Sequence, residues 1–335
     1  MNSKELAKLI GVSQSTISRA LNGSPQISEQ RRQEIVELAK KHNFEFNLNA
    51  RNLRNQTSSF VGILLPDYFS SFIKDVYRST QFNYLYEELS KRDLDLVLLS
   101  GDELFNDASA LERAIKKRQL AGLILWGRIK KEAVIKYLKT LRIPVLAMTR
   151  CNEMMKFLPS VSVNSYQQGY LMGEHFASRG YRRIGTIRHS FGSVSMITEG
   201  FRDALKDHGI ILDDSDILVG GIDYHEAYDT VMRSIDRIRT YDAIFTQSDT
   251  MAIGTMTALK ESGLSIPDDI ALAGNDNTPM AKWSSPSLTS IEPFVQHQAQ
   301  VTSRRISSMI HDGVDPVEEK HYVITPKLVI RESCP

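Results

Sequence analysis

Short hydrogen-bonding side chains crowd the segment GVSQSTISRALNGSPQIS, residues 11–28. It carries six hydroxyl groups, two Gln, one Asn and one Arg on few apolar residues. Gln can hydrogen-bond the edge of adenine through two atoms, Arg can do the same with guanine, and Ser or Thr can bond bases or phosphates. This chemistry predicts contact with the major groove of DNA. The alternative is the solvated polar face of an ordinary three-helix bundle.

Apolar residues at helical spacing predict three helices that would position these side chains. We expect the first after an N-cap at Ser3, the second from about Gln14 to Leu21 behind a turn at Gly11, and the third from about residue 29 to 42. Two short helices joined by a glycine turn and backed by a third form a helix-turn-helix, whose second helix enters the major groove. The open face of that helix would present five polar side chains: Gln14, Ser15, Thr16, Ser18 and Arg19.

Basic charge is concentrated at this end of the chain. Residues 1–56 hold nine Lys and Arg against five Asp and Glu, while the whole chain holds 41 against 40. The remainder is therefore slightly acidic. This distribution favours a head that meets a polyanion and a body with another task. Position, charge and the segment that follows together favour DNA binding over a plain helical bundle.

The polar segment NFEFNLNARNLRNQTSS, residues 43–59, separates the head from a new apolar strand at Phe60 and is predicted to be a linker. Within it, ARNLR has weak helical character, since Ala50 and Leu53 are three residues apart. An apolar Leu in a polar linker needs a partner. It either docks on the body or enters a minor groove as a wedge that kinks the duplex.

Strands and helices alternate through the rest of the chain. This order predicts an α/β body with doubly wound parallel sheets, and its length suits two lobes better than one. The expected strands are 60–66, 94–100, 122–127, 144–148, 183–188, 242–247 and 270–275, and the expected helices include 109–120, 165–179, 198–208 and 249–262. A ligand of such sheets binds beyond the carboxyl ends of the strands, in the cleft between the lobes.

Several function classes lack their signature residues. The sequence has no GxGxxG or GxxxxGK[ST] segment, no defensible catalytic triad and no metal-ligand cluster, so we expect no cofactor, no metal and no enzyme activity. The polar N-terminus, the two cysteines (Cys151 and Cys334) and the lack of a long apolar run predict a cytoplasmic protein without membrane contact. An exported sugar-binding receptor and a cytosolic α/β enzyme are the alternatives from other classes.

Residues 6–53 resemble, almost without gaps, the DNA-binding head and hinge of the lactose-repressor/galactose-repressor family. The resemblance implies that Gln14, Ser15 and Arg19 bind the major groove. It implies further contacts from Thr16, Ser18 and Asn22 to bases or phosphates, and from Ala50 and Leu53, with Arg54 beside them, in the minor groove. Because Leu53 of two subunits would meet across one dyad, it also implies a homodimer on a palindromic operator in double-stranded DNA.

The body resembles the same family through YQQGYLMGEHFASRGYRRIG, EGFRDAL, SDTMAIGTMTALKESGLSIPDDIALAGNDN and PSLTSIEP. The resemblance implies a two-lobed periplasmic-binding-protein-like fold with chain crossings near Asn164, Ile291 and Tyr322. The chain ends at Pro335 without a leucine-heptad tail, which favours a dimer over a tetramer. The expected domains are a head (1–45), a hinge (46–59), an N-lobe (60–163 plus 292–322) and a C-lobe (164–291 plus 323–335).

The expected effector site departs from the family pattern. Ile197 stands where family members commonly carry Arg, Thr149 where Asp is usual and Ile222 where a ring usually stacks, while Asp276 matches the family's ligand-binding Asp. Losing the bidentate Arg weakens a sugar or purine assignment. The full set of expected effector contacts is Tyr68, Phe69, Arg128, Arg150, Arg188, Ser193, Tyr224, Ser248 and Asp276.

Three of these residues, Arg128, Arg150 and Arg188, fall at strand ends. They are solvated rim charges, or they form an anion site for a sugar phosphate or carboxylate, or the cleft has lost its small ligand and a protein partner regulates it. The anion site is our preferred hypothesis. The protein is thus predicted to be a DNA-binding transcriptional regulator, a repressor of a metabolic operon under effector control.

Overall fold

The computed structural model describes residues 3–21, 26–42, 58–65, 76–127, 129–149, 155–189 and 196–335. The chain divides into two compact units, Met1–Ser58 and Ser59–Pro335, which we call the head and the body.

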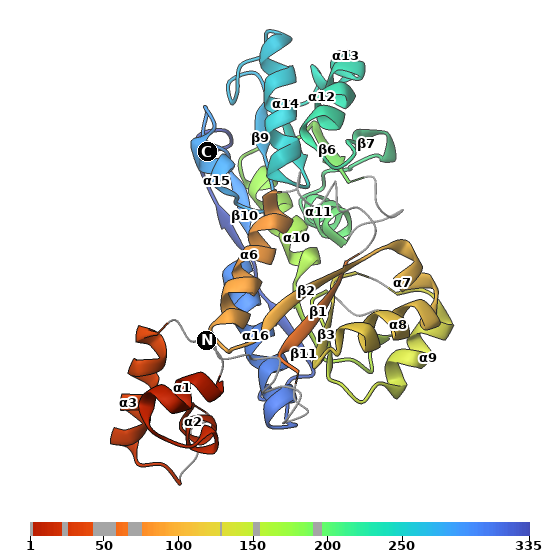
Figure 1. Ribbon diagram of the computed structural model, residues 1–335. Helices are drawn as coiled ribbons and strands as arrows, with labels where there is room; N and C mark the ends of the chain where they lie inside the picture. The colour runs from red at the N-terminus through yellow and green to blue at the C-terminus, as the bar shows by residue number, and fades with distance from the viewer. Residues whose placement is uncertain are drawn as a thin grey trace. The chain divides into compact units, whose positions relative to one another are not determined.

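The described residues of the head form helices α1 (Ser3–Ile10), α2 (Gln14–Leu21) and α3 (Glu29–Lys41) (Figure 1). Helix α1 begins at Ser3 itself, one residue earlier than a cap at that position would place it. One apolar side of each helix faces a common core made of Leu6, Ala7, Ile17, Ala20, Ile35 and Ala39. The predicted helix-turn-helix arrangement is confirmed.

The larger sheet of the body is entirely parallel, with strand order β11-β5-β4-β3-β1-β2. Its strands are β1 (Phe60–Leu65), β2 (Asp95–Ser100), β3 (Gly122–Leu125), β4 (Val145–Ala147), β5 (Ser160–Val163) and β11 (His321–Ile324). Side chains alternate between its faces: Leu64 packs under α7 (Asp102–Asn106), α8 (Ala108–Arg118) and α9 (Glu132–Thr140), whereas Ile63 packs under α6 (Val76–Ser90) and α16 (Val295–His311). Burial on both faces explains the continuous apolar strands.

The smaller sheet is parallel as well, with strand order β7-β6-β8-β9. Its strands are β6 (Ile184–Arg188), β7 (Ile217–Val219), β8 (Ala243–Thr246) and β9 (Ala271–Ala273). Phe245 packs beneath α10 (Ser165–Ser178) and α11 (Met196–Asp207), and Ile244 packs on the other face, beneath a layer comprising α12 (Tyr224–Arg233), α13 (Ile235–Ile238), α14 (Asp249–Glu261) and α15 (Pro279–Trp283). The predicted α/β class with two parallel sheets is confirmed.

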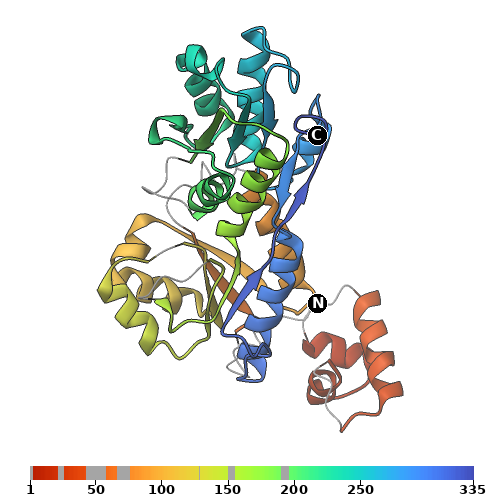
Figure 2. The same cartoon turned by 180° about the vertical axis from the view of Figure 1, so that it is seen from behind.

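Three segments join the two sheets. Strand β5 ends at Val163 and α10 begins at Ser165; β10 (Ser290–Glu292) leads into α16; and β11 leads into β12 (Lys327–Val329). Strands β10 and β12 pair antiparallel and run side by side (Figure 2). Strand β11, which contains Tyr322, ends at Ile324, so the chain leaves the larger sheet after Ile324.

Candidate nucleic-acid interface and effector site

The turn between α1 and α2 fixes the direction of the second helix. Gly11 adopts a φ of 71°, in the left-handed region that favours glycine, and the backbone N–H of Val12 donates to the carbonyl of Ala7 at 3.0 Å. Ser13 then caps α2, since the backbone N–H of Thr16 donates to its Oγ at 3.1 Å. Ile17 anchors the inner face of α2, so the polar side chains around it must lie on the outer face.

The exposed face of α2 carries side chains that were predicted from the sequence to contact bases. Gln14, Ser15 and Arg19 are exposed and Thr16 is half-buried. The Oγ atom of Ser13 lies 2.7 Å from Ser15 Oγ and 2.8 Å from Thr16 Oγ1, so hydroxyl groups gather at the N-terminal end of the helix. Ser15 and Arg19, four residues apart, project from one side.

The charge on α2 differs from that on α3. Helix α2 contains Arg19 and no acidic residue, whereas the arginines of α3 are paired within their own helix, Arg31 with Glu34 at 2.7 Å and Arg32 with Glu29 at 2.6 Å. The positive charge of α2 is therefore not neutralised within its own helix. The side chain of Ser18 and the residues Asn22, Ala50, Leu53 and Arg54 lie outside the described part of the chain, and their assignments stay predictions.

In the body, Asp276 lies in a loop that several distant segments hold. Asp276 and Asn277 both have positive φ, 108° and 46°. The backbone N–H of Asp276 donates to the carbonyl of Ile291 at 2.9 Å, and the Asn275 side chain donates to Asp276 Oδ1 at 2.8 Å. Arg331, near the C-terminus, donates to Asn277 Oδ1. This unusual backbone persists because β10 and the C-terminal segment both fix it.

Asp249, fully buried at the start of α14, holds the same loop through hydrogen bonds from Thr278. Its Oδ2 accepts hydrogen bonds from the backbone N–H of Thr278 at 2.6 Å and from the hydroxyl of Thr278 at 3.0 Å, and its Oδ1 accepts from the Ser290 hydroxyl at 2.6 Å. Burial raises the pKa of Asp249 to about 7, against the opposing effect of these donors and of Arg331. The buried carboxyl group of Asp249 thus binds a proton more readily than an exposed aspartate does.

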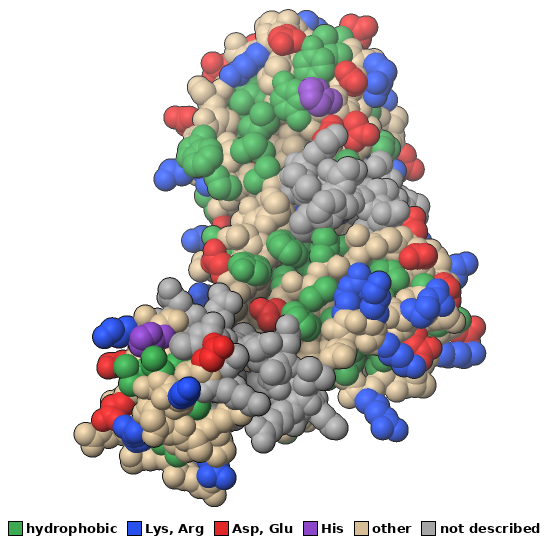
Figure 3. Space-filling view, viewed as in Figure 1, with side chains coloured by type: hydrophobic (Ala, Val, Ile, Leu, Met, Phe, Trp, Pro, Cys, Tyr) green, Lys and Arg blue, Asp and Glu red, His purple; other side chains and the backbone are tan. Residues whose placement is uncertain are grey.

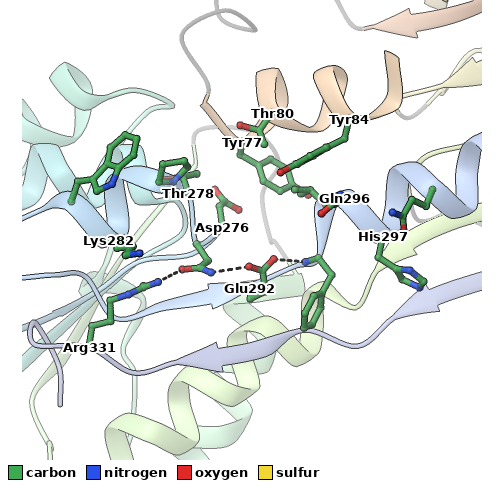
Figure 4. Close-up of a pocket in the computed structure, with 16 residues that line it drawn as sticks. Tyr77, Thr80, Tyr84, Asp276, Thr278, Lys282, Glu292, Gln296, His297 and Arg331 are labelled. Atoms are coloured by element: carbon green, nitrogen blue, oxygen red, sulfur yellow. Dashed lines mark hydrogen bonds between the residues drawn. The ribbon is translucent and has the colours of Figure 1, made fainter. Parts of the chain in front are cut away.

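A pocket of about 630 Å³ opens beside this loop, between α6 and the C-terminal half of the chain. Tyr77, Thr80 and Tyr84 of α6 face Asp276 and Thr278 across it (Figure 4). A row of hydrogen bonds, from Arg331 to Asn277, from Asn277 to Glu292 and from the Phe294 backbone to Glu292, lines its floor. Carboxylates, a lysine (Lys282) and tyrosine rings together can bind a polar molecule that carries several hydroxyl groups.

Arg188 lines a different pocket from the one beside Asp276. Arg188 ends β6 and lines a pocket of about 540 Å³ with Thr198, Glu199, Arg202, Asp203, Asp214 and Ile217. Three carboxylates surround the two arginines there, and Arg202 is paired with Asp214. Arg188 therefore lines this pocket, whereas Asp276 lines the one beside α6. Arg128, Arg150, Tyr68, Phe69 and Ser193 are outside the described part.

The remaining two expected effector contacts have local roles as well. Ser248 is buried and caps α14, its Oγ accepting from the backbone N–H of Met251 at 3.2 Å. Tyr224 begins α12, is half-buried and stacks on Tyr228 with ring centroids 6.4 Å apart. Sequence reasoning missed Tyr77, Tyr84, Lys282, Glu292 and Arg331 around Asp276. Only Glu292, inside the quoted PSLTSIEP segment, offered a signal.

The described residues contain no cluster of three or more His, Cys, Asp or Glu placed to hold a metal ion. No helix among them is both long and apolar enough to span a membrane.

Comparison with known proteins gives consistent matches along the chain. Residues 3–47 match the family "Bacterial regulatory proteins, lacI family", and residues 174–334 match "Periplasmic binding protein-like domain". The HTH-type transcriptional regulator MalR of Clostridium butyricum is 26% identical, covering 100% of this chain and 99% of its own.

Solved structures give the same fold. The lac repressor dimer bound to operator and the anti-inducer ONPF matches with a TM-score of 0.81 at 19% identity, covering 100% of this chain and 99% of its own. The transcriptional regulator CelR–cellobiose complex matches with a TM-score of 0.73 at 22% identity, covering 99% of both chains. These relatives are regulators rather than enzymes, which confirms the prediction of no enzyme activity. With a matching DNA-binding head, a matching periplasmic-binding-protein-like body and a full-length regulator as a relative, the chain belongs to the lacI family of bacterial DNA-binding transcriptional regulators.

Proposed function

We propose that the protein is a homodimeric repressor that binds a palindromic operator through α2 and is switched by a small molecule bound to the body. The exposed, acid-free polar face of α2, with Gln14, Ser15 and Arg19 on it, carries this proposal. Each subunit would place one α2 in a major groove, and the two Leu53 side chains would meet in the minor groove between them. The domain division 1–45, 46–59 and two lobes is part of the proposal, with the last crossing placed after Ile324.

Replacing Arg19 with alanine is expected to weaken operator binding by about 1–3 kcal/mol, since a bidentate contact to one base is lost. The operator would first be selected from random duplexes with the wild-type protein. Fluorescence anisotropy would then compare Arg19→Ala on the operator and on a shuffled duplex, and the ratio of the two affinities should fall.

The control for this experiment is Arg31→Ala, which removes an exposed arginine from α3. It should leave the ratio of the two affinities unchanged, since a general loss of positive charge carries no sequence information. If Arg19→Ala kept the wild-type ratio, α2 would not be the helix that distinguishes the operator from other DNA.

For the effector, the described residues favour a ligand with several hydroxyl groups that contacts Asp276. Carboxylate oxygens accept hydrogen bonds from hydroxyl groups, and tyrosine rings pack on sugar faces. The cellobiose bound in the CelR structure fits this chemistry. An anionic ligand, such as a sugar phosphate or carboxylate held by Arg128, Arg150 and Arg188, is the second candidate, supported by three arginines at strand ends. Control by a protein partner is the third.

Thermal unfolding against a panel of neutral sugars, sugar phosphates and carboxylates separates these candidates. A ligand at about 100 times its Kd should add roughly 2.7 kcal/mol to the free energy of unfolding. We expect a neutral sugar to do so, and Asp276→Asn to abolish the effect. Asp268→Asn, at an exposed position, should retain it. Stabilisation by anionic compounds alone would favour the arginine site, and no stabilisation would favour a protein partner.

A further inference from the structure

Positive charge gathers in a second place, far from the head in the sequence. Residues 111–142 contain ten Lys and Arg and two Asp and Glu, which leaves 31 Lys and Arg against 38 Asp and Glu in the remainder of the chain. This stretch is thus strongly basic, whereas the remainder of the chain is acidic. Its charge excess is larger than that of residues 1–56.

Helices α8 and α9 place these residues on one surface. Their apolar sides, including Leu111 of α8 and Leu138 of α9, enter the same core beneath one face of the six-stranded sheet. Their other sides therefore point outward together, and Figure 3 shows several blue side chains over this part of the body. We call this the α8–α9 surface; its exposed basic residues are Arg113, Lys116, Lys117, Arg118, Lys130, Lys131, Lys136, Lys139 and Arg142.

Helix stability explains only some of these charges. Lys116, Lys117 and Arg118 lie in the last turn of α8, where cations are favoured by the helix dipole. Lys130 and Lys131 precede α9, and Lys131 is its N-cap without a side-chain hydrogen bond to the helix. A cation at a helix N-terminus opposes the dipole, so the lysines before α9 need another reason to be there.

Local ion pairing accounts for two of the lysines only. Lys116 pairs with Glu112 at 2.6 Å and Lys136 with Glu132 at 2.8 Å, both exposed pairs within one helix. Lys117, Lys130, Lys131 and Arg142 make no ion pair with any described residue. The surface therefore has positive charge available for a partner.

The composition of the surface indicates the class of that partner. The described residues between 101 and 150 include no large exposed apolar side chain, and six of the nine basic residues are lysine. Protein–protein interfaces have apolar or aromatic centres and are depleted in lysine. A phosphate backbone, in contrast, is bound by flexible cations without an apolar centre. We propose that the α8–α9 surface is a second, sequence-independent DNA-binding surface that contacts the phosphates of a duplex.

The expected energetic effect is large enough to measure. Each phosphate that a lysine or arginine neutralises contributes about 0.9 to the slope of log affinity against log salt concentration. Four such contacts would change the affinity about a hundredfold between about 50 and 200 mM salt. This contribution would add to that of the head for any sequence, so it would raise operator and non-operator binding alike.

The test uses the full chain and a duplex without operator. One variant combines Lys117→Gln, Lys130→Gln, Lys131→Gln and Arg142→Gln. The matched control combines Arg179→Gln, Lys206→Gln, Lys320→Gln and Lys327→Gln, four exposed positions elsewhere that remove the same net charge. Anisotropy titrations over a series of salt concentrations give affinity and slope, and circular dichroism checks that both variants fold.

We expect the α8–α9 variant to lose at least about tenfold in affinity at 50 mM salt and about 3 to 4 in the magnitude of the slope. The slope of log affinity against log salt concentration for the control variant should differ from the wild-type slope by less than about one. Equal losses in both variants would overturn the proposal, since net charge would then explain the result. An unchanged slope would overturn it as well, and if binding to poly-glutamate were lost in that case, an acidic protein would be the partner. The ratio of operator to non-operator affinity, which Arg19→Ala tests, should stay unchanged, so failure of this surface is distinguishable from failure of operator binding.

Discussion

Replacing Arg305 with alanine is expected to lower the free energy of unfolding of the body by about 3–5 kcal/mol, as breaking a buried ion pair does. Arg305 is fully buried, and its Nε donates to Asp315 Oδ1 at 2.9 Å. The guanidinium also donates to the carbonyl of Ser160 at 3.0 Å and to that of Lys320 at 3.2 Å. Truncation leaves these acceptors buried without their donor. Since the Asp315 side chain is 26% exposed, water can solvate it partly, and the lower end of the range is expected.

Urea unfolding followed by circular dichroism measures this loss as a shift of the transition midpoint. The control is Arg304→Ala, at the exposed neighbouring position on the same helix, which should change the free energy of unfolding by less than about 0.5 kcal/mol. The double variant Arg305→Leu with Asp315→Leu removes both charges and should recover part of the loss. Equal destabilisation by the two single variants would show that Arg305 acts only through helix α16 and not through its ion pair.

Arg305 also illustrates why part of the fold escaped prediction. Helix α16 has the sequence VQHQAQVTSRRISSMIH, and its buried side includes Gln298, Ser303 and Arg305. Apolar periodicity is weak in this helix, because its inner face mixes these polar side chains with Ala299, Val301 and Ile306. Five short strands were missed for another reason: each has three or four residues, and none is both wholly apolar and buried, as the equally short β4 and β9 are. They are β5, β7, β10, β11 and β12. The predicted strands and helices, in contrast, bury their apolar sides in the cores, as β3 and α14 show.

The two candidate sites also differ in how far the sequence could predict them. The face of α2 was predictable because one short segment supplies every member of it and the helical repeat fixes their directions. The surroundings of Asp276 were not, because Tyr77, Glu292 and Arg331 come from three segments that only the fold brings together. The positive φ of Asp276 and Asn277 depends on the same tertiary contacts. A short segment determines the directions of its own side chains. A pocket assembled from distant segments can be predicted only when the topology is known as well.

Helices α10 and α11 cross with their backbones in direct contact, at a pair of glycines. A Cβ atom added to Gly169 would lie 1.8 Å from the carbonyl oxygen of Ile197, and one added to Gly200 would lie 1.9 Å from that of Tyr166. Neither obstacle is a side chain that can rotate away. The two helices must therefore separate if either glycine gains a side chain.

Separation would also disturb the C-lobe core and the start of α11. Phe201 of α11 packs against Phe176 and Phe245, with ring centroids 5.8 and 5.0 Å apart, and the Gln247 side chain donates to Thr198 Oγ1 at 2.6 Å. Thr198 follows Ile197, the position at which the resemblance to the family implies a ligand-binding Arg. The glycine pair thus sets both the packing of the core and the position of α11 relative to β8.

Replacing Gly169 with alanine is expected to destabilise the body by about 3 kcal/mol or more, as forced overpacking does at its upper range. Helix propensity alone predicts the opposite, a gain of about 1 kcal/mol for Gly→Ala inside a helix, so the sign of the change decides between the two effects. Urea unfolding measures it. Gly173→Ala, whose Cβ would lie 2.7 Å from the Cβ of Ala204 and 2.8 Å from the carbonyl oxygen of Phe201, should cost less, because this overlap is smaller than the one at Gly169. Stabilisation by Gly169→Ala would mean that the helices can separate freely, and the close crossing would then not hold α11 in place.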